Sequence, residues 1–136
     1  MKYIITLLLF ATSLSLSAQD ENEKLIGTWT GESKGEVGSF IFDEEGFVTI
    51  IIGQDTFGGK SFEMEGMTGN MTYVVDFNGD PHSLEMTLNI DGVGPTGTLY
   101  GLFEYIDEDT MKMGAGAMNE KITAITEENS IILRRQ

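Results

Sequence analysis

The 136-residue chain contains no cysteine, only two prolines and few basic residues. Without a thiol it can form neither a disulfide nor a thiolate zinc site, and it has no cysteine nucleophile. Its 8 lysines and arginines stand against 22 aspartates and glutamates, which gives a formal net charge of −14. A surface of this sign repels phosphate backbones and anionic lipid. We therefore expect binding neither to nucleic acid nor to a membrane surface.

One long apolar run is present, and it lies at the N-terminus. The run from Tyr3 to Ala11 follows a basic second residue and precedes mostly small residues up to Ala18. This layout is typical of a secretory signal peptide, and the run is shorter than the roughly 20 residues that span a bilayer. We expect residues 1–18 to be a signal peptide and residues 19–136 to be a single exported domain. That domain would be periplasmic or extracellular, with no stable membrane anchor.

Glycine, aromatic and β-branched residues are abundant in the rest of the chain. The whole chain contains 17 glycines, eight phenylalanines and four tyrosines, and all of these except Tyr3 and Phe10 lie after residue 18, with many threonines, valines and isoleucines. Short β-branched and aromatic runs separated by glycine predict an all-β fold. We expect strands near residues 26–33, 36–42, 47–52, 60–65, 70–77, 82–90, 96–106, 110–115, 121–126 and 130–135.

The turns between these strands predict which side chains share a face. Asn78-Gly79 suits a two-residue type I′ turn. A hairpin folded there pairs Tyr73 with Leu84. It also pairs Met71 with Met86, so that all four apolar side chains lie on one face, as half-buried antiparallel strands require.

Three other turns are predicted in the same way. A loop at 107–109 pairs Phe103 with Met113 and Tyr105 with Met111, a loop at 43–46 pairs Phe42 with Phe47, and a loop at 127–129 pairs Ile125 with Ile131. Short turns throughout indicate that neighbouring strands pair in chain order. A meander of about eight to ten strands leaves two exposed edges unless it closes. We therefore expect an antiparallel up-and-down meander closed into a barrel, and a sandwich is the alternative.

Catalytic and metal motifs are weak. His82 is the single histidine, expected as an exposed turn residue, and no nucleophile elbow accompanies it. The glycine-rich segment Gly53–Gly59 lacks the Lys-Ser/Thr ending of a phosphate loop. Residues 76–80 resemble the start of a calcium loop, but Pro81 and Thr87 stand where glycine and glutamate are required. We expect neither an enzyme nor a bound cofactor.

Methionine is frequent: seven residues besides Met1. Thioethers are soft ligands, and together with His82 several of them could hold Cu(I). The alternative is that most of them fill the core or form an adaptable apolar lining. The predicted registers favour this second interpretation, because they place four methionines on inward faces: Met71, Met86, Met111 and Met113. We therefore predict no metal site.

The two ends of the domain carry the motifs of a known family. Gly27-Thr28-Trp29 opens the first expected strand, and Leu133-Arg134-Arg135 closes the last. A Gly-x-Trp on the first strand, answered by an arginine at the end of the final strand, is similar to the lipocalin (calycin) pattern. Residues 24–136 as a whole resemble the small exported bacterial lipocalin-like proteins, with further likeness in 42–48 and 71–81. The resemblance implies an up-and-down barrel.

Trp29 and Arg135 are expected to close one end of that barrel. An indole laid across a barrel end seals it with one large side chain. A guanidinium stacked on the indole adds a cation–π contact and hydrogen-bond donors for strand-end carbonyls. Alternation places Arg135 on the same face as Leu133, so we assign it the stacking role. Both residues are interpreted as structural.

In the family, the barrel interior binds small apolar molecules. We therefore expect a small apolar or amphipathic ligand inside the barrel, its polar head oriented by the hydroxyls of Tyr73 and Tyr100. The predicted ligand-lining residues are Met71, Tyr73, Leu84, Met86, Leu88, Tyr100 and Phe103. The alternative is a filled barrel that binds or inhibits a protein partner through its acidic loops or through Phe47–Ile52. An interior void of about 300 Å³ or more would favour the ligand.

Overall fold

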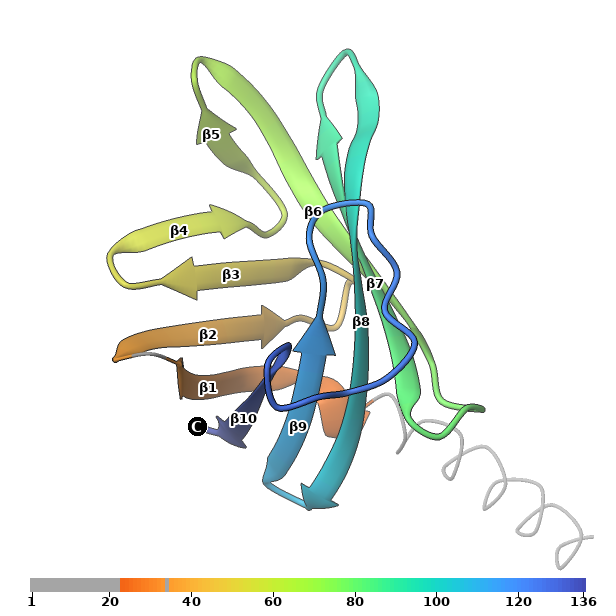
Figure 1. Ribbon diagram of the computed structural model, residues 1–136. Helices are drawn as coiled ribbons and strands as arrows, with labels where there is room; N and C mark the ends of the chain where they lie inside the picture. The colour runs from red at the N-terminus through yellow and green to blue at the C-terminus, as the bar shows by residue number, and fades with distance from the viewer. Residues whose placement is uncertain (1–22, 34) are drawn as a thin grey trace, which may run out of the picture.

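The computed structural model describes residues 23–33 and 35–136. The predicted signal peptide lies outside the described residues. Ten strands make up the domain (Figure 1): β1 (Gly27–Ser33), β2 (Glu36–Phe42), β3 (Val48–Ile52), β4 (Asp55–Gly58), β5 (Phe62–Met64), β6 (Met67–Asp76), β7 (His82–Ile90), β8 (Gly94–Asp107), β9 (Thr110–Ala115) and β10 (Ser130–Arg135).

All ten strands belong to one antiparallel sheet in the order β4-β3-β2-β1-β10-β9-β8-β7-β6-β5. Strands that follow one another in sequence pair with each other, except β4 and β5; β9 and β10 pair although a longer loop connects them. The first and last strands also pair, with Trp29 opposite Arg135. The sheet curls into a nearly closed barrel, so the predicted all-β antiparallel meander is confirmed.

The remaining seam of the barrel lies between β4 and β5, which form the two edges of the sheet. Figure 1 shows these two short strands diverging from the connection between them. Strand β6 closes one part of this seam. The amides of Met71 and Tyr73 each donate to a carbonyl 3.0 Å away, on Gly59 and Gly46 respectively. The barrel is therefore shut along one part of the seam and splayed along the rest.

The hairpin registers agree with the sequence in one case and shift in two. In β8–β9, Phe103 lies opposite Met113, as predicted. In β6–β7, however, Tyr73 lies opposite Met86 and not Leu84. Pro81 cannot donate to the ladder, so pairing begins only after it and the connection is longer than two residues. Because the shift is two residues, each side chain keeps its predicted face.

The β2–β3 register shifts by a single residue. Phe42 lies opposite Val48 and not Phe47. The carboxylate of Asp43 accepts a hydrogen bond from the Phe47 amide (2.9 Å), which holds Phe47 within the loop. Gly46 has the expected positive φ, 95°. The side chain of Asp43 therefore adds one residue to the loop.

The predicted strand at 121–126 is wrong, and β4 was not predicted. Residues 116–129 form an irregular loop, and β10 pairs directly with β9, with Ile131 opposite Met113. Asparagine side chains replace a sheet ladder in this loop. Asn129 donates to the Ala124 carbonyl (3.0 Å), and Asn119 accepts from the Thr98 amide (2.9 Å). These bonds compete with the strand that β-branched residues alone would favour.

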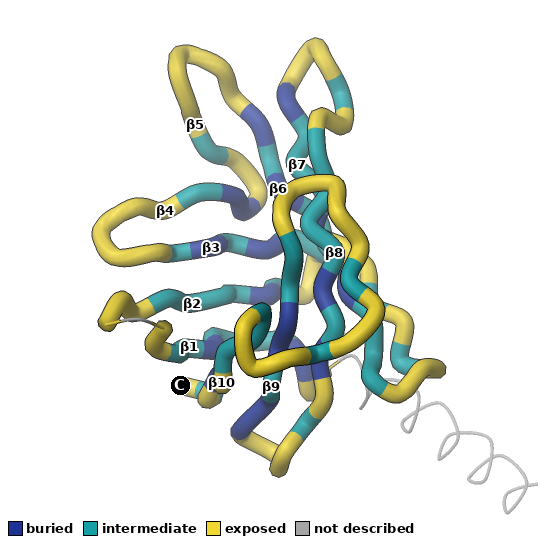
Figure 2. Tube along the Cα trace, viewed as in Figure 1, coloured by how far each residue is buried: buried dark blue, intermediate teal, exposed yellow. Residues whose placement is uncertain are grey.

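The core lies inside the barrel and follows the alternation of the strands. Figure 2 shows buried residues within the strands and exposed residues at the hairpin tips. All four methionines predicted to face inward are at most 2% exposed. The buried cluster consists of Leu25, Trp29, Phe42, Val48, Ile50, Met71, Leu84, Met86, Phe103, Met111, Met113 and Leu133.

Candidate functional site

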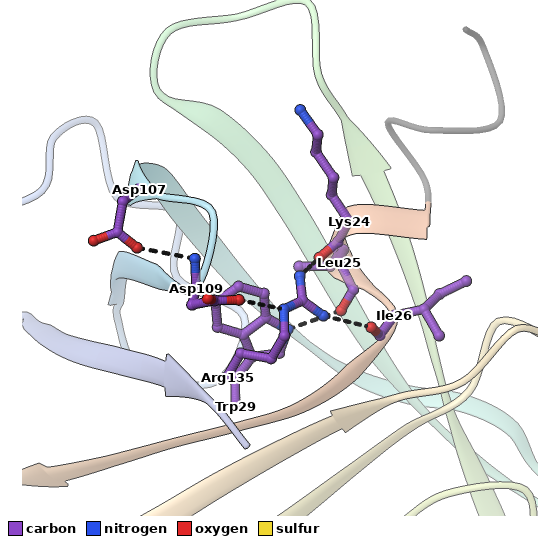
Figure 3. A network of polar contacts seen from close by, with 7 residues as sticks. All are labelled: Lys24, Leu25, Ile26, Trp29, Asp107, Asp109 and Arg135. Atoms are coloured by element: carbon purple, nitrogen blue, oxygen red, sulfur yellow. Dashed lines mark hydrogen bonds and ion pairs between the residues drawn. The ribbon is translucent and has the colours of Figure 1, made fainter. Parts of the chain in front are cut away.

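One end of the barrel, which we call the closed end, is sealed by Trp29, Arg135 and residues 24–26 (Figure 3). Trp29 is 0% exposed, and its indole N–H donates to the Leu25 carbonyl (2.9 Å). The Arg135 guanidinium carbon lies 4.4 Å from the centroid of the indole ring. The stacking expected from the sequence is therefore present.

The Arg135 guanidinium also joins three separate segments at the closed end. It donates to the carbonyls of Ile26 (2.9 Å) and Lys24, and its Nε lies 3.4 Å from the Asp109 carboxylate. Asp109 in turn donates its amide to Asp107, and this hydrogen bond to the ionised carboxylate lowers the pKa of Asp107. One side chain thus connects the N-terminal segment, the β8–β9 turn and the last strand.

A charged pocket of about 470 Å³ lies beside this network. Its lining residues carry both signs of charge: Lys24, Tyr105, Asp107, Glu108, Asp109 and Arg135. The Tyr105 hydroxyl is buried with no hydrogen-bond partner. Burial raises the pKa of Tyr105 to about 12, although the positive charge of Arg135 acts in the opposite direction. Because the Arg135 guanidinium is already engaged with the carbonyls of Lys24 and Ile26 and with Asp109, this pocket is a weaker candidate for a ligand.

His82 lies among aromatic rings at the closed end, so the expectation of an exposed turn residue is wrong. Its ring is 5.3 Å from those of Phe77 and Phe103, and its Nδ1 is buried with no partner. The even-numbered alternation of β7 also places Leu84 inward. Because His82 is two positions before Leu84, the alternation in the sequence already indicates that His82 faces inward. His82 is a half-buried residue that packs against aromatic rings.

The opposite end of the barrel contains a pocket of about 440 Å³, which we call the mouth pocket. Apolar side chains from three strands form its walls: Phe40 of β2, Ile50 of β3 and Ile131 of β10. All three belong to the inward face, because Phe40 pairs with both Trp29 and Ile50, and Ile131 pairs with the buried Met113. The pocket is therefore continuous with the barrel interior and opens to solvent.

The mouth is hollow because its inward positions are small. Gly31 and Gly38 lie directly opposite each other on β1 and β2, and Ala115 ends β9. A Cβ on Gly31 would lie 2.4 Å from the Ile132 carbonyl oxygen, so glycine allows β1 and β10 to approach closely. A Cβ on Gly38 would have as its nearest neighbour the Ile51 oxygen at 3.6 Å, so that position borders open space.

The predicted ligand-lining residues lie elsewhere in the interior. Four of them, Met71, Leu84, Met86 and Phe103, are at most 1% exposed and fill the core. Tyr73 and Leu88 are half-buried and pack against that core. None of these six side chains lines the mouth pocket. The sequence therefore located the barrel interior correctly but not its empty part.

The two tyrosine hydroxyls predicted to orient a polar head group do not meet. Tyr100 pairs with the exposed Glu85 on the outer face, where the Lys121 ammonium lies 5.1 Å from its ring. Its assignment as a lining residue is wrong, because Tyr100 and the inward Phe103 differ by an odd number of positions. Tyr73 donates to the Asp43 carbonyl (2.7 Å), and burial followed by the Asp43 charge raises the pKa of Tyr73.

The residues that line the mouth were missed, although two signals were present. Inward alternation from Phe42 reaches Phe40 and then Gly38, and a bulky residue followed by a small one indicates a space. The charged lining residues that the structure describes are Glu36 and Glu128. Apolar walls with a carboxylate rim can hold an alkyl or ring system.

Comparison of the chain with protein-family models, with curated proteins and with solved structures gave no match. The nearly closed antiparallel barrel is consistent with a lipocalin-like fold. Within residues 23–33 and 35–136, no group of three or more histidine and acidic side chains is placed to hold a metal ion. No helix in that part of the chain is both long and apolar enough to span a membrane.

Proposed function

We propose that this protein is an exported β-barrel that binds a small apolar or amphipathic molecule in the mouth pocket. The observation that carries the proposal is the hollow of about 440 Å³ between Phe40, Ile50 and Ile131. It lies within the size range of small-molecule sites, which are mostly apolar clefts of about 300–1,000 Å³. The packed closed half supplies a rigid base for it.

Export and kinship with the lipocalins belong to the same proposal. The signal-peptide pattern of residues 1–18 supports export. The stack of Arg135 on Trp29, at the point where the first and last strands pair, supports the kinship. The side chains of the mouth pocket are apolar groups, hydroxyls, one amide and two carboxylates, so we propose binding and not catalysis.

A protein-binding role through the acidic turns has less support. Glu44 and Glu45 border a small pocket beside Leu25, and Glu108 borders the pocket beside Lys24. Glu128 lines the mouth pocket at the other end. Acidic turns at opposite ends do not form one continuous surface. A basic partner captured in a strongly salt-dependent manner, with no small ligand bound, would favour this second role.

The ligand hypothesis is tested with a neutral fluorescent probe, N-phenylnaphthylamine, and two adjacent isoleucines. Ile131 faces the mouth pocket, whereas Ile132 is 39% exposed on the outer face. We expect saturable binding of the probe and a loss of about tenfold in affinity for Ile131→Ser, because a buried side chain contributes about 1.5–3 kcal/mol. Ile132→Ser should bind as the unmodified protein does.

Circular dichroism and urea unfolding of both variants show whether each remains folded. If the folded, unmodified protein does not bind the probe, the proposed function is contradicted. So would equal losses in the two folded variants, because the probe would then be bound outside the mouth.

A further inference from the structure

We propose that the ligand of the mouth pocket carries a positive charge: an amine or quaternary ammonium attached to one apolar chain or ring system. This inference rests on the proposed function and names its ligand class. It follows from the kinds of polar group that the rim leaves available for a ligand.

The rim carries two carboxylates from separate elements. Glu36 begins β2 and Glu128 precedes β10, and β1 lies between these two strands in the sheet. Both side chains line the mouth pocket and both are exposed. A Cβ on Gly53, in the β3–β4 turn, would lie only 3.1 Å from the Glu36 Oε1. Glycine at this position therefore leaves room for the Glu36 carboxylate at the mouth.

The hydrogen-bond donors of the same lining are largely engaged within the chain. The Asn129 amide donates to Ala124, and the Ser130 hydroxyl donates to Thr126. The Ser39 hydroxyl shares a hydrogen bond of 2.8 Å with Thr30. An anionic head group requires free donors or basic side chains. The mouth offers chiefly acceptors, which are what an ammonium requires.

The basic side chains that the structure describes lie away from the mouth pocket. Lys24 and Arg135 line the pocket at the closed end. Lys60 is paired with Glu45 (3.0 Å), and Lys121 lies over Tyr100 on the outer face. Neither these four cations nor the other two that the structure describes, Lys112 and Arg134, line the mouth pocket, so they do not neutralise its rim.

The whole-chain charge acts in the same direction. A formal net charge of −14 attracts cations and repels anions, over a range limited to about 8 Å at physiological ionic strength. A fatty acid would therefore be opposed both by the rim and by the surrounding surface. An ammonium can place its head between Glu36 and Glu128 while its tail contacts Phe40, Ile50 and Ile131.

Competition against bound N-phenylnaphthylamine tests the charge directly. Three ligands share one alkyl chain and are used below their micellar concentrations: dodecyltrimethylammonium, dodecanoate and dodecanol. We expect dodecyltrimethylammonium to displace the probe at a concentration about tenfold lower than dodecanoate does. This preference should decrease as salt is added.

Single-charge variants locate the effect at the rim. Glu36→Gln and Glu128→Gln should each weaken ammonium binding about threefold, as expected for exposed ion pairs, and the double variant about tenfold. Glu32→Gln is the matched control, because Glu32 is exposed on the outer face of β1 and its loss changes the net charge equally. Binding to this control should be unchanged.

Lys34 stands between Ser33 and Glu36 in the sequence and lies outside the described residues. The series is therefore repeated with Lys34→Gln, and a preference for the ammonium that persists supports the proposal. Equal displacement by all three ligands, or tighter binding of dodecanoate, overturns the charge inference and leaves the proposed function standing. Failure of the probe itself to bind overturns the proposed function as well.

Discussion

The two ends of the barrel are built by the same strands but filled differently. On β1 the inward residue at the closed end is Trp29, 0% exposed, and two positions later it is Gly31. On β9, Met113 is 2% exposed, and the next inward residue is Ala115. A change from large to small side chains along single strands therefore separates a packed half from a hollow half.

The two halves of the barrel therefore have different roles, although the same alternation of inward and outward residues builds both. Alternation decides which side chains enter the barrel, whereas side-chain volume decides whether they fill it. The filled half buries most of the apolar surface and stabilises the fold. Because the hollow half contributes less to stability, its residues are available for ligand selection. Changes at the two ends should therefore affect different measurements.

The largest expected effect is the loss of the indole at the closed end. Trp29→Ala removes a fully buried side chain and should lower the free energy of unfolding by about 3–5 kcal/mol. Phe40→Ala, at the half-exposed wall of the mouth, should cost about 1–2 kcal/mol because less surface is buried there. Urea unfolding is followed by circular dichroism, since Trp29 is the single tryptophan. Equal costs at the two ends would contradict the comparison.

The next effect concerns the guanidinium that joins the segments of the closed end. Arg135→Ala leaves the carbonyls of Ile26 and Lys24 without their donor and should cost about 1.5–3 kcal/mol. Arg135→Lys should recover only part of this, because an ammonium lacks the planar fork. Arg134→Ala, on the exposed face of the same strand, should change stability by less than about 0.5 kcal/mol.

These differences in stability are read from urea midpoints at constant slope. Full recovery by Arg135→Lys would show that charge alone matters and that the fork geometry does not. A large effect of Arg134→Ala would show that the whole C-terminal strand, and not the stack on Trp29, holds the closed end together.

A smaller effect distinguishes the two facing glycines of the mouth. Gly31→Ala should cost about 1–3 kcal/mol, because the new Cβ would approach the Ile132 oxygen to 2.4 Å. Gly38→Ala meets only the Ile51 oxygen, at 3.6 Å, and should be neutral or stabilising by less than about 1 kcal/mol. The free energies of unfolding of the two glycine-to-alanine variants, measured in urea, therefore show which of the two positions borders open space. Equal destabilisation would contradict a hollow at Gly38.

The sequence predicted the fold because alternation and turn chemistry agree over most of the chain. The predicted β8–β9 pairing of Tyr105 with Met111 was correct, because a bulge between Tyr105 and Asp107 offsets the short turn that pairs Asp107 with Thr110. Errors arose where a single residue changed the loop length. Pro81 lacks an amide hydrogen, and the Asp43 carboxylate accepts a hydrogen bond from the Phe47 amide within its own loop. Such local bonds are weak signals beside the hydrophobic pattern.

The candidate site was harder to predict than the fold. Sequence reasoning selected large inward side chains such as Met86 and Phe103, but large side chains fill a barrel and do not leave space. The hollow depended on small residues, Gly38 and Ala115, which no apolar pattern emphasises. The assignment of Tyr100 as a lining residue was a different kind of error. The two-residue period of a strand already places Tyr100 and Phe103 on opposite faces of the sheet.

The smallest expected effect is at Tyr105, whose ring packs 6.1 Å from that of Trp29. Its hydroxyl is buried without a partner, so Tyr105→Phe should leave stability at neutral pH unchanged or raise it by less than about 1 kcal/mol. Tyr100→Phe, on the outer face, is the matched control. A clear loss of stability in Tyr105→Phe would show that the hydroxyl is hydrogen-bonded after all.

The alkaline limb of the stability profile sharpens this prediction. Burial raises the pKa of Tyr105 from 10.0 to about 12, so the folded state holds the phenolic proton more tightly than the unfolded state does. The resulting stabilisation is complete below pH 10 and is lost as the pH rises from 10 towards 12. Urea unfolding at several pH values should show this loss diminished in Tyr105→Phe and retained in Tyr100→Phe. A part should remain in Tyr105→Phe, because burial also raises the pKa of Tyr73. Identical alkaline profiles for the two variants would mean that Tyr105 is no more shielded from solvent than a tyrosine on the outer face, and that the closed end is not sealed there.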